Sequence, residues 1–413
     1  MDFNPHFHIN GKVGWSTFGY YLSERPSFTL DPLLHAGAYY VQEASSMFLE
    51  QALKQSTDLS KPLRVLDLCA APGGKSTLLQ SLISNESLLV SNEVIKTRVH
   101  VLVENLIKWG VTNTIVTNND PKDFARLENY FDVMVVDAPC SGSGLFRRDP
   151  DAIKEWSEEN VKLCSLRQQR ILADAWPALK NSGILIYSTC SFSKSEDEDI
   201  LDWLSENFEV EGIQLKTKAH WNIVETFSEK SNAYGYRFYP DQLKGEGFFI
   251  SVLRKKQGDE YFNYPKSNKK LIAKPNKNEE ATIRNWIRVD QDVDIIKKDS
   301  HLYALPSNSI SDFLQLQSSV YIKKAGVLLG KMAHDELLPD HELALSSLFS
   351  PNISHIDLSK DQALRYLRKE EIKLEGNSPG WAVLQFENQN LGWAKILPNR
   401  VNNYYPQEWR IRI

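Results

Sequence analysis

Short apolar runs alternate with longer helical patterns along the chain between residues 64 and 254. Residues of high strand propensity predict β-strands at 64–68, 87–93, 113–118, 131–138 and 183–188. Apolar side chains that recur at steps of three and four predict helices at 76–83, 95–109 and 157–179. This succession is typical of an α/β fold, in which helices cover both faces of a mostly parallel sheet. In such a sheet, ligands bind beyond the carboxyl ends of the strands.

The sequence on either side of this segment predicts further domains. A proline-containing aromatic stretch followed by a helical pattern indicates an N-terminal subdomain, and the runs NFEVEGIQ and GFFISVLR predict strands that close the α/β domain. A basic linker then precedes an intermediate α/β region, and the strand-like runs WAVLQFE and NLGWAKIL predict a smaller β-rich C-terminal domain. In chain order, these five parts are expected at residues 1–60, 61–256, 257–277, 278–345 and 346–413.

The composition is that of a folded globular protein without an overall positive charge. Of the 413 residues, 42% are hydrophobic and 24% are charged, and the formal net charge is −5. This charge excludes binding to nucleic acid through the field of the whole molecule, so any such contact must be local. The best local candidate is the basic segment from Arg254 to Lys277, which fits a solvated linker and a phosphate-contacting strip equally well.

The sequence contains no secretion signal and no apolar run long enough to span a membrane. We therefore expect a cytoplasmic protein that does not associate with membranes. The four cysteines, Cys69, Cys140, Cys164 and Cys190, lack the spacings of a zinc site or a disulfide framework. We expect four reduced thiols and no bound metal.

The first predicted strand leads directly into the sequence CAAPGGK, in which Gly73 and Gly74 open a helix. Small residues let backbone amides approach a ligand closely, and a helix N-terminus favours negative charge. The dinucleotide-binding pattern is not met, because only two adjacent glycines are present. GGKST is not a P-loop either, because Cys69 stands in place of its first glycine. A nucleoside triphosphate is therefore not the expected ligand.

Acidic residues stand near the ends of four successive strands, namely Asp67, Glu93, Asp120 and Asp137. Glu93 follows the glycines by about 20 residues, where a carboxylate can accept hydrogen bonds from both hydroxyls of a ribose. Asp120 stands where it can receive the amino group of an adenine, although on its own it fits a surface turn equally well. The series predicts a ribose-bearing cofactor without a triphosphate, and S-adenosylmethionine fits this description.

Two of the cysteines follow strands, in the sequences DAPC and YSTC. A thiolate at Cys140 or Cys190 can add to carbon 6 of a pyrimidine, which makes carbon 5 nucleophilic enough to take a methyl group from a sulfonium. A single buried cysteine is more commonly a small core residue, and we keep that interpretation for the other two cysteines. Residues Ser193 to Glu196 predict a capping box, whose helix would lower the pKa of the Cys190 thiol.

Five segments of the chain carry a resemblance to a known family. They are HAGAYYVQEASSMF, VLDLCAAPGGKSTLL, FDVMVVDAPCSGSGLFRRDPDA, LIYSTCSFSKSEDE and YRFYPDQLKGEGFF, and they extend from about residue 35 to residue 255. In this order they resemble the Sun-type RNA cytosine-5 methyltransferases. The resemblance implies a Rossmann-like, S-adenosylmethionine-dependent methyltransferase domain. The residues that it places at the cofactor are Cys69, Ala70, Ala71, Pro72, Gly73, Gly74, Lys75, Glu93, Asp120 and Asp137.

The resemblance also implies a catalytic role for three residues. Cys190 would be the covalent nucleophile, and Cys140 would help to release the enzyme after methylation. Asp137 would lie near the exocyclic amine and the ring nitrogen of the target cytosine, where it stabilises the attacked base.

The last portion of the chain, from LGKMAHDELLPDHELALS to LGWAKILPNRVNNYYPQEWR, resembles the PUA-like tail of one subgroup of this family. That subgroup modifies small-subunit ribosomal RNA. The resemblance implies that the C-terminal domain binds RNA and that 16S ribosomal RNA is the substrate. Because the family has a longer segment ahead of the YYL sequence, we expect a truncated form of the N-terminal RNA-facing subdomain.

A target cytosine in helical RNA must be extruded before a thiol can reach it, and phosphate and stacking contacts must offset that cost. Arg147 and Arg148 follow the DAPC loop on the same edge of the sheet and are candidates for contacts to phosphates. Phe146 and Trp156 are candidates for stacking on a base. A solvated arginine pair beside two aspartates remains an alternative.

Other functions fit parts of the sequence. A DNA cytosine-5 methyltransferase carries its attacking thiol in the Pro-Cys loop, so the second thiol, Cys190, argues against it. A small-molecule methyltransferase needs neither thiol. A transfer RNA cytosine-5 methyltransferase, or a non-catalytic RNA-binding ribosome assembly factor on a methyltransferase scaffold, remains an alternative. We expect a monomer whose partner is RNA.

Overall fold

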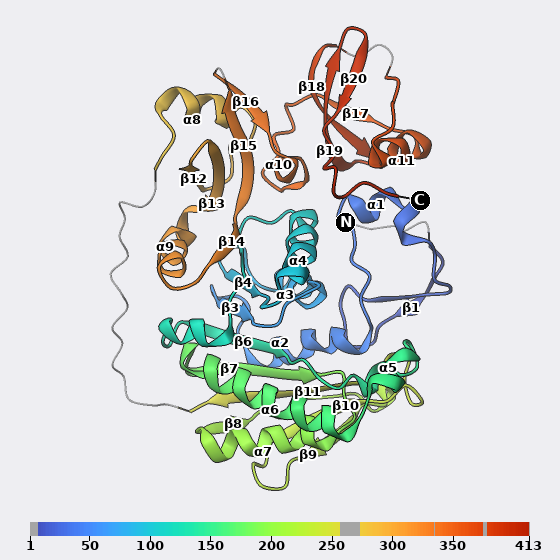
Figure 1. The fold of residues 1–413 in the computed structure, drawn as a ribbon, viewed down its shortest axis with the longest axis vertical. Coiled ribbons are helices and arrows are strands. Elements are labelled where there is room, and N and C mark those ends of the chain that lie inside the picture. Colours follow the sequence, from blue (N-terminus) through green and yellow to red (C-terminus); the bar gives the residue numbers. More distant parts are fainter. Residues whose placement is uncertain (1–6, 257–272, 334, 375–377, 413) are drawn as a thin grey trace.

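A ten-stranded sheet forms the centre of the molecule, and the structure, a computed structural model, describes residues 7–256, 273–333, 335–374 and 378–412. Five neighbouring strands are parallel, in the order β5-β4-β3-β6-β7 (Figure 1). They are β3 (Arg64–Asp67), β4 (Leu88–Asn92), β5 (Thr114–Thr117), β6 (Phe131–Asp137) and β7 (Leu179–Thr189). The five strands predicted from the sequence are confirmed, and their carboxyl ends meet at one edge of the sheet.

Antiparallel strands extend this parallel core on both sides. On one side lie β11 (Phe248–Lys255), β10 (Tyr234–Phe238) and β9 (Val224–Phe227), with β8 (Val210–Gly212) paired to β11. On the other side β14 (Ile322–Ala325), from the predicted intermediate region, pairs with β5. The amide of Asn119 holds this edge strand, because it exchanges hydrogen bonds of 2.9 and 2.8 Å with the backbone of Tyr321. The intermediate region therefore shares the central sheet.

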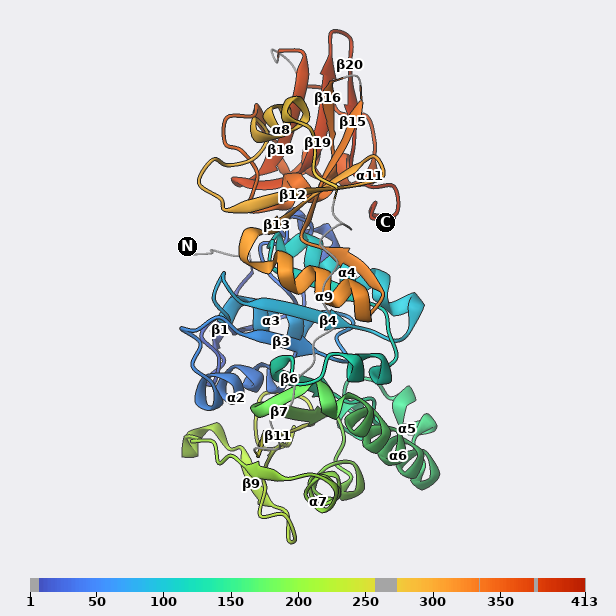
Figure 2. The same cartoon turned by 90° about the vertical axis from the view of Figure 1, so that its left-hand side faces the viewer.

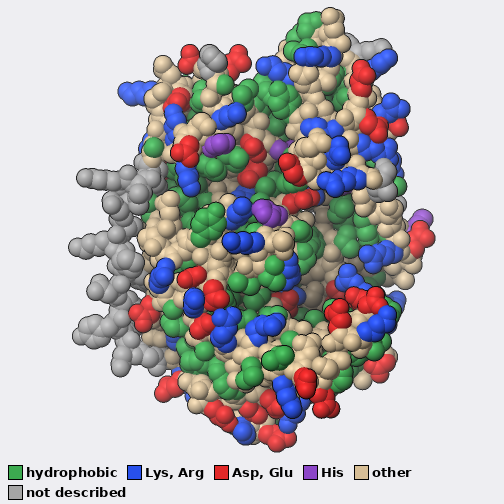
Figure 3. Space-filling view, viewed as in Figure 1, with side chains coloured by type: hydrophobic (Ala, Val, Ile, Leu, Met, Phe, Trp, Pro, Cys, Tyr) green, Lys and Arg blue, Asp and Glu red, His purple; other side chains and the backbone are tan. Residues whose placement is uncertain are grey.

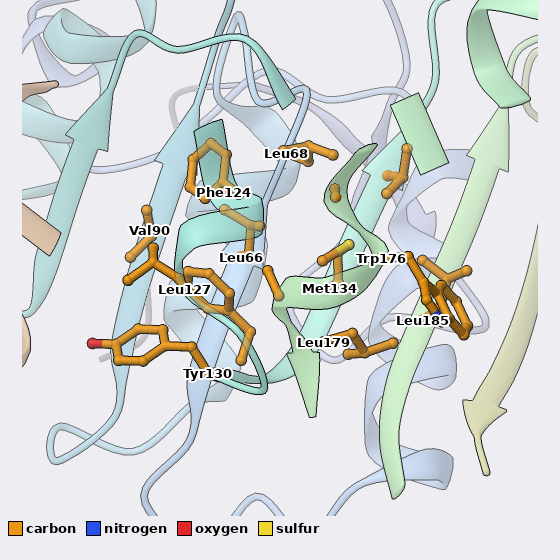
Figure 4. Packing of buried hydrophobic residues seen from close by; sticks show 14 of the residues in the cluster. Leu66, Leu68, Val90, Phe124, Leu127, Tyr130, Met134, Trp176, Leu179 and Leu185 are labelled. Carbon is orange, nitrogen blue, oxygen red and sulfur yellow. The ribbon is translucent and has the colours of Figure 1, made fainter. Parts of the chain in front are cut away.

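Helices cover both faces of the sheet, as the sequence predicts (Figure 2). One face carries α6 (Glu158–Ala175), α7 (Glu198–Asn207) and α9 (Ile310–Ser319). The other carries α2 (Leu49–Ser56), α3 (Gly74–Leu82) and α4 (Lys96–Trp109). Along β6, Met134 belongs to the first core and its neighbours Val133 and Val135 to the second, because successive side chains of a strand point to opposite faces. Figure 4 shows Leu66, Met134 and Leu185 from neighbouring strands in the first core.

Two four-stranded sheets form the C-terminal part of the molecule. The first contains β12 (Val293–Lys298), β13 (His301–Pro306), β15 (Val327–Ala333) and β16 (Glu336–Pro339). The second contains β17 (His355–Asp357), β18 (Gly380–Phe386), β19 (Gln389–Leu397) and β20 (Arg400–Asn403). The runs WAVLQFE and NLGWAKIL form β18 and β19, so the predicted β-rich C-terminal domain is confirmed.

The C-terminal sheet packs against the N-terminal subdomain and against α4. Leu33 of α1 (Pro32–His35) belongs to the same apolar core as Leu367 of α11 (Lys360–Arg368) (Figure 1). Gly110 ends α4 with a φ of 73°, and a Cβ at this position would lie 2.3 Å from the carbonyl oxygen of Leu345. This close approach requires glycine. The helix that reaches the predicted cofactor loop therefore also supports the C-terminal part.

The remaining elements are short, namely β1 (Ile9–Lys12), β2 (Tyr20–Leu22), α5 (Asp151–Glu155), α8 (Lys277–Arg284) and α10 (His341–Leu345). Within the described residues, no helix is both long and apolar enough to cross a bilayer. Most of the predicted basic linker, residues 257–272, lies outside the described part of the chain, so the two interpretations of that segment stay open.

Candidate active site

The glycine-containing turn lies between the carboxyl end of β3 and α3. Gly73 has a φ of 120°, which favours glycine, and a Cβ on Gly74 would lie 2.9 Å from the ring of Tyr40. Two side chains of α4 fix the turn from the other side. Arg98 donates to the carbonyl of Ala71 at 2.6 Å, and Asn105 donates to the carbonyl of Pro72 at 2.8 Å. The backbone of residues 69–75 is therefore fixed in position at the edge of the sheet where ligands bind.

Two of the four predicted acids are buried beside this turn. Glu93 follows β4, accepts a hydrogen bond of 2.8 Å from the backbone of Ile95, and lies 3.6 Å from the guanidinium of Arg98. Asp67 ends β3 and accepts a hydrogen bond of 2.6 Å from Ser76, while its Oδ1 has no partner among the described residues. Burial raises the pKa of Asp67 to about 7, against the opposing effect of the Ser76 hydrogen bond. A buried oxygen without a partner is consistent with a polar ligand at this position.

Asp120 lies at the same edge but is engaged by the protein. Its Oδ1 accepts a hydrogen bond of 3.3 Å from the backbone of Lys122 and caps a 3-10 turn, Pro121–Arg126. Its Oδ2 lies 3.4 Å from the guanidinium of Arg170. Both carboxylate oxygens therefore have protein partners, as the alternative of a surface turn predicts.

Asp137 and Lys75 form an ion pair at the end of β6. Lys75 Nζ lies 2.8 Å from Asp137 Oδ2, and the hydroxyl of Ser188 donates to Asp137 Oδ1 at 2.8 Å. Burial, the largest single effect, lowers the pKa of Lys75, but the charge and the hydrogen bond of Asp137 together with the charge of Asp67 outweigh burial, so that the pKa is raised. Lys75 therefore stays positively charged and orients the Asp137 carboxylate.

The thiols of Cys140 and Cys190 face each other at the ends of the neighbouring strands β6 and β7. Their sulfur atoms are 2.8 Å apart, which exceeds a disulfide bond of about 2.05 Å, and both cysteines are free. The hydrogen bond with Cys190, followed by burial, raises the pKa of Cys140 well above its usual value. Cys140 therefore keeps its proton near neutral pH. The structure brings together these two cysteines and Asp137 at the predicted edge.

The predicted capping box after Cys190 is wrong. Ser193 makes no capping hydrogen bond, residues Lys194–Glu196 form only a 3-10 turn, and α7 starts at Glu198. No capped helix therefore begins at Ser193. The side chain of Glu196 has turned inwards, because polar groups from both cysteine loops converge on it.

Glu196 is a functional candidate that sequence reasoning missed. Its side chain is fully buried and accepts hydrogen bonds from the backbone of Ser141 at 2.8 Å, the Ser141 hydroxyl at 2.5 Å and the Ser191 hydroxyl at 2.6 Å. Ser141 follows Cys140 and Ser191 follows Cys190. One carboxylate therefore ties both thiol-bearing loops together.

Replacing Glu196 by glutamine is expected to lower both stability and activity. The amide nitrogen cannot accept a hydrogen bond, so either both serine hydroxyls, which share Oε2, or the backbone of Ser141 and the amide of Gln168, which share Oε1, lose their acceptor. The free energy of unfolding should fall by about 1 to 3 kcal/mol. The rate of methyl transfer should fall at least tenfold, because the two thiols are no longer held at one distance. Urea unfolding and initial rates measure the two effects. The exposed Glu159→Gln on α6 is the matched control, and a Glu196→Gln protein equal to it in both assays would refute the role of the carboxylate.

A buried arginine and two acidic residues, Asp197 and Glu198, also support the turn that follows Cys190. Arg237, in the YRFYPD sequence of β10, is buried and donates to Glu198 at 2.8 Å and to the carbonyl of Phe192 at 3.1 Å. The same guanidinium lies 3.0 Å from Asp197, the residue that precedes α7. The sequence motif containing Arg237 therefore serves to position the chain that follows Cys190.

The predicted RNA-contacting arginines differ in their surroundings. Arg147 is exposed, donates to the carbonyl of Gly245 at 2.7 Å and forms an ion pair of 3.2 Å with Glu246. The guanidinium of Arg148 is exposed and has no protein partner among the described residues. Phe146 and Trp156 pack edge to face at 6.5 Å, and Trp156 is 38% exposed. Of the two arginines, Arg148 is the one whose charge is free for a phosphate.

The surface charge does not gather into one field on the face shown in Figure 3. Lysine and arginine side chains there are interspersed with aspartate and glutamate. The mixed charges on this face agree with the net charge of −5. A protein without a large positive field attracts RNA only through local positive groups.

The sheet order, the glycine turn after β3 and the buried acid after β4 define a Rossmann-like, S-adenosylmethionine-dependent methyltransferase. Comparison with known proteins agrees with this class. Residues 55–254 match the model of the 16S rRNA methyltransferase RsmB/F family, and residues 353–411 match that of the methyltransferase RsmF PUA domain. The PUA match confirms the predicted character of the C-terminal domain.

Individual relatives are similar over most of their length. The chain is 31% identical to the ribosomal RNA small subunit methyltransferase F of Shigella boydii, over 90% of this chain and 78% of the relative. It is 30% identical to the protein of the same name from Shewanella woodyi, over 96% of this chain and 84% of the relative. A crystal structure of a methyltransferase homolog from Pyrococcus horikoshii superposes with a TM-score of 0.51 at 32% identity, over 60% of this chain and 79% of that one. The chain belongs to the RsmB/F methyltransferase family, which confirms the predicted family and its S-adenosylmethionine dependence.

Proposed function

We propose that this protein transfers a methyl group from S-adenosylmethionine to carbon 5 of a cytosine in 16S ribosomal RNA. The observation that carries the proposal is the pair of thiols, Cys140 and Cys190, 2.8 Å apart beside the Asp137 carboxylate at the ligand edge of a methyltransferase sheet. The names of the relatives, ribosomal RNA small subunit methyltransferase F, support the choice of RNA. A methyltransferase acting on a nucleophilic oxygen or nitrogen would need neither thiol.

The reaction starts with the sulfur of Cys190 as nucleophile. The Cys190 thiolate adds to carbon 6 of the cytosine, and the electron pair of the 5,6 double bond becomes available at carbon 5. When bound, S-adenosylmethionine supplies an electrophilic methyl group on its sulfonium. After methylation, a base takes the proton from carbon 5, the electron pair of that C–H bond restores the 5,6 double bond, and the Cys190 sulfur leaves carbon 6 as a thiolate. Cys140, 2.8 Å from Cys190, assists this release of the enzyme from the product.

Asp137 stabilises the base as it is attacked. Addition of the thiolate to carbon 6 increases the negative charge on the ring nitrogen of the cytosine. A fixed carboxyl group beside it can share a proton with that nitrogen and accept a hydrogen bond from the exocyclic amine. The ion pair of 2.8 Å with Lys75 and the hydrogen bond from Ser188 hold this carboxyl group in one orientation. Lys75 and Ser188 are therefore positioning residues for Asp137.

The cofactor would lie along the carboxyl ends of β3, β4 and β5. The methionine part of the cofactor would contact the segment after β3, namely Cys69, Ala70, Ala71, Pro72, Gly73, Gly74 and Lys75. Glu93 would bind its ribose and Asp120 its adenine, and Asp137 would complete the site. The unpartnered Oδ1 of Asp67 supports this placement. Burial also raises the pKa of the Cys69 thiol, so Cys69 contributes its backbone rather than a thiolate.

We place the RNA on three parts of the chain. The N-terminal subdomain and the PUA domain, proposed at residues 1–60 and 346–413, would hold RNA outside the catalytic pocket. Arg147 and Arg148 would contact phosphates beside the extruded cytosine, and the free charge of Arg148 supports its part in this. The protein would act in the cytoplasm as a monomer, and its free cysteines are consistent with a reducing compartment.

Methyl transfer to defined RNAs tests the proposed function. Purified enzyme with tritiated S-adenosylmethionine should label 16S ribosomal RNA, free or in small subunits, at one cytosine. Bisulfite sequencing of RNA from cells with and without the gene should locate the same cytosine. Label in transfer RNA alone, or no label in any RNA, would contradict the proposal and favour one of the two alternatives drawn from the sequence.

A further inference from the structure

A pocket of about 510 Å³ lies apart from the cysteine pair, between the N-terminal subdomain and the segments that flank β9 and β10. Its volume is in the range of pockets that hold small ligands. Three separate parts of the chain line it: the β1-β2 region, the turn Ala219–Trp221 and the loop at 240–244. None of the residues that line it was a candidate in the sequence.

The pocket combines aromatic rings with positively charged amines. Lys244 Nζ lies 5.9 Å above the ring of Tyr21, and Lys12 also lines the pocket. Asp241 is the single acidic residue among the described lining residues. Rings that offer a stacking face beside amines that offer charge are the pattern of single-stranded nucleic-acid sites.

The same pattern continues on the surface around the pocket. Lys12 Nζ lies 5.5 Å above the ring of Tyr20, which is 45% exposed, and Lys218 Nζ lies 5.5 Å above the ring of Trp221, which is itself buried. Phe18, in the turn between β1 and β2, is 64% exposed. Exposed aromatic residues beside lysines form a surface along which a strand can extend.

One loop connects this pocket to the cysteine pair. The loop runs from β10 to β11, and its outer part, 240–244, lines the pocket. At its inner end, Gly247 donates to the carbonyl of Gly144 at 3.0 Å, and Gly144 donates to the carbonyl of Cys190 at 2.9 Å. Between the two ends, Arg147 is anchored on the carbonyl of Gly245. A strand that enters the catalytic pocket can therefore follow this loop outwards.

We propose that this pocket binds a nucleotide of the RNA substrate that flanks the target cytosine, with a phosphate at Lys12 and Lys244 and a base against Tyr21. The inference rests on the proposed function, since it assumes an RNA strand at the cysteine pair. Binding here stabilises the RNA with the target base extruded, because the flanking nucleotide is held while the cytosine leaves its stack. Binding of this flanking nucleotide increases the affinity for RNA and leaves the rate of methyl transfer unchanged.

The double variant Lys12→Glu, Lys244→Glu tests the pocket. Its dissociation constant for a 16S ribosomal RNA transcript, measured by fluorescence anisotropy, should rise at least tenfold, and its KM for the same RNA should rise in parallel. The rate at saturating RNA should change less than twofold. The slope of log affinity against log salt should decrease by roughly 1, since each phosphate contact to a single strand contributes about 0.7.

The matched control exchanges two lysines away from the pocket, Lys298→Glu on β12 and Lys323→Glu on β14, which carry the same change of charge. An affinity loss equal in both double variants would overturn the proposal, because the field of the whole molecule would then explain it. A transcript with 4-thiouridine gives a second readout on the unmutated protein. Crosslinks should fall on peptides containing Tyr21 or Trp221, and crosslinks confined to other parts of the chain would also overturn it.

The experiment separates this pocket from the proposed function. If the unmutated enzyme methylates 16S ribosomal RNA and the Lys12, Lys244 variant matches its control, the pocket assignment alone is wrong. If the enzyme binds the transcript but methylates no cytosine in it, the proposed function is wrong, and the comparison of affinities still decides whether the pocket contacts RNA.

Discussion

Replacing Cys190 by alanine is expected to abolish methyl transfer, with a loss of at least about 10⁴-fold in rate. The reason is chemical: without a sulfur at carbon 6, carbon 5 of cytosine is not nucleophilic enough to attack a sulfonium. Transfer of tritium from labelled S-adenosylmethionine to 16S ribosomal RNA measures the loss. Binding of the cofactor should be unchanged, because Cys190 lies after β7, whereas the glycine turn and Glu93 follow β3 and β4.

Cys164→Ala is the matched control for this variant. Cys164 is also a free thiol, but it is buried in α6 and burial raises its pKa, so it is no nucleophile. This variant should keep its activity within about twofold, as expected for a small core substitution that leaves the site untouched. A Cys190→Ala enzyme with more than a tenth of the unmutated rate would show that the reaction does not pass through this sulfur.

Replacing Cys140 by alanine is expected to have the opposite effect on the covalent intermediate. Cys190 can still attack, but the release step loses the thiol that lies 2.8 Å from it, so a protein-RNA adduct should accumulate. Most of the enzyme should run as a shifted band on a denaturing gel after incubation with RNA and S-adenosylmethionine, while turnover falls at least a hundredfold. The raised pKa of Cys140 supports this role, since a thiol that keeps its proton near pH 7 does not compete as a nucleophile.

The double variant Cys140→Ala, Cys190→Ala is the control for the adduct. It retains the RNA-binding surface, so any band that it forms reports non-specific crosslinking. A shifted band of equal intensity in the single and double variants would contradict the division of labour between the two thiols. The reverse pattern, an adduct in Cys190→Ala and none in Cys140→Ala, would exchange their roles.

The parallel core could be predicted because its strands are buried on both faces and read as continuous apolar runs. The edge strand β14 could not be predicted in this way. Its sequence IKKA is short and half polar, and it joins the sheet through backbone pairing with β5 and through the side chain of Asn119, some 200 residues earlier, which binds the backbone of Tyr321. Contacts of this range leave no periodic signal in the local sequence.

The catalytic edge was accessible from the sequence for a physical reason. The carboxyl ends of parallel strands meet at one edge, so residues that follow strands, such as Asp137, Cys140 and Cys190, are brought together by the fold itself. The turn after Cys190 was misinterpreted, because Ser193 and Glu196 have the spacing of a capping box. Glu196 instead satisfies hydroxyl and amide groups from two loops, and this tertiary demand outweighs the local pattern.

The identity of the residue that carries the RNA tests the covalent mechanism most directly. Nuclease and trypsin treatment of the adduct formed by Cys140→Ala should leave a nucleotide on one peptide, 181–194, in which Cys190 is the single cysteine. Mass spectrometry should find the added mass on that sulfur, with the methyl group already on the pyrimidine. A nucleotide on Cys69 or Cys164, or on a residue other than cysteine, would contradict the mechanism.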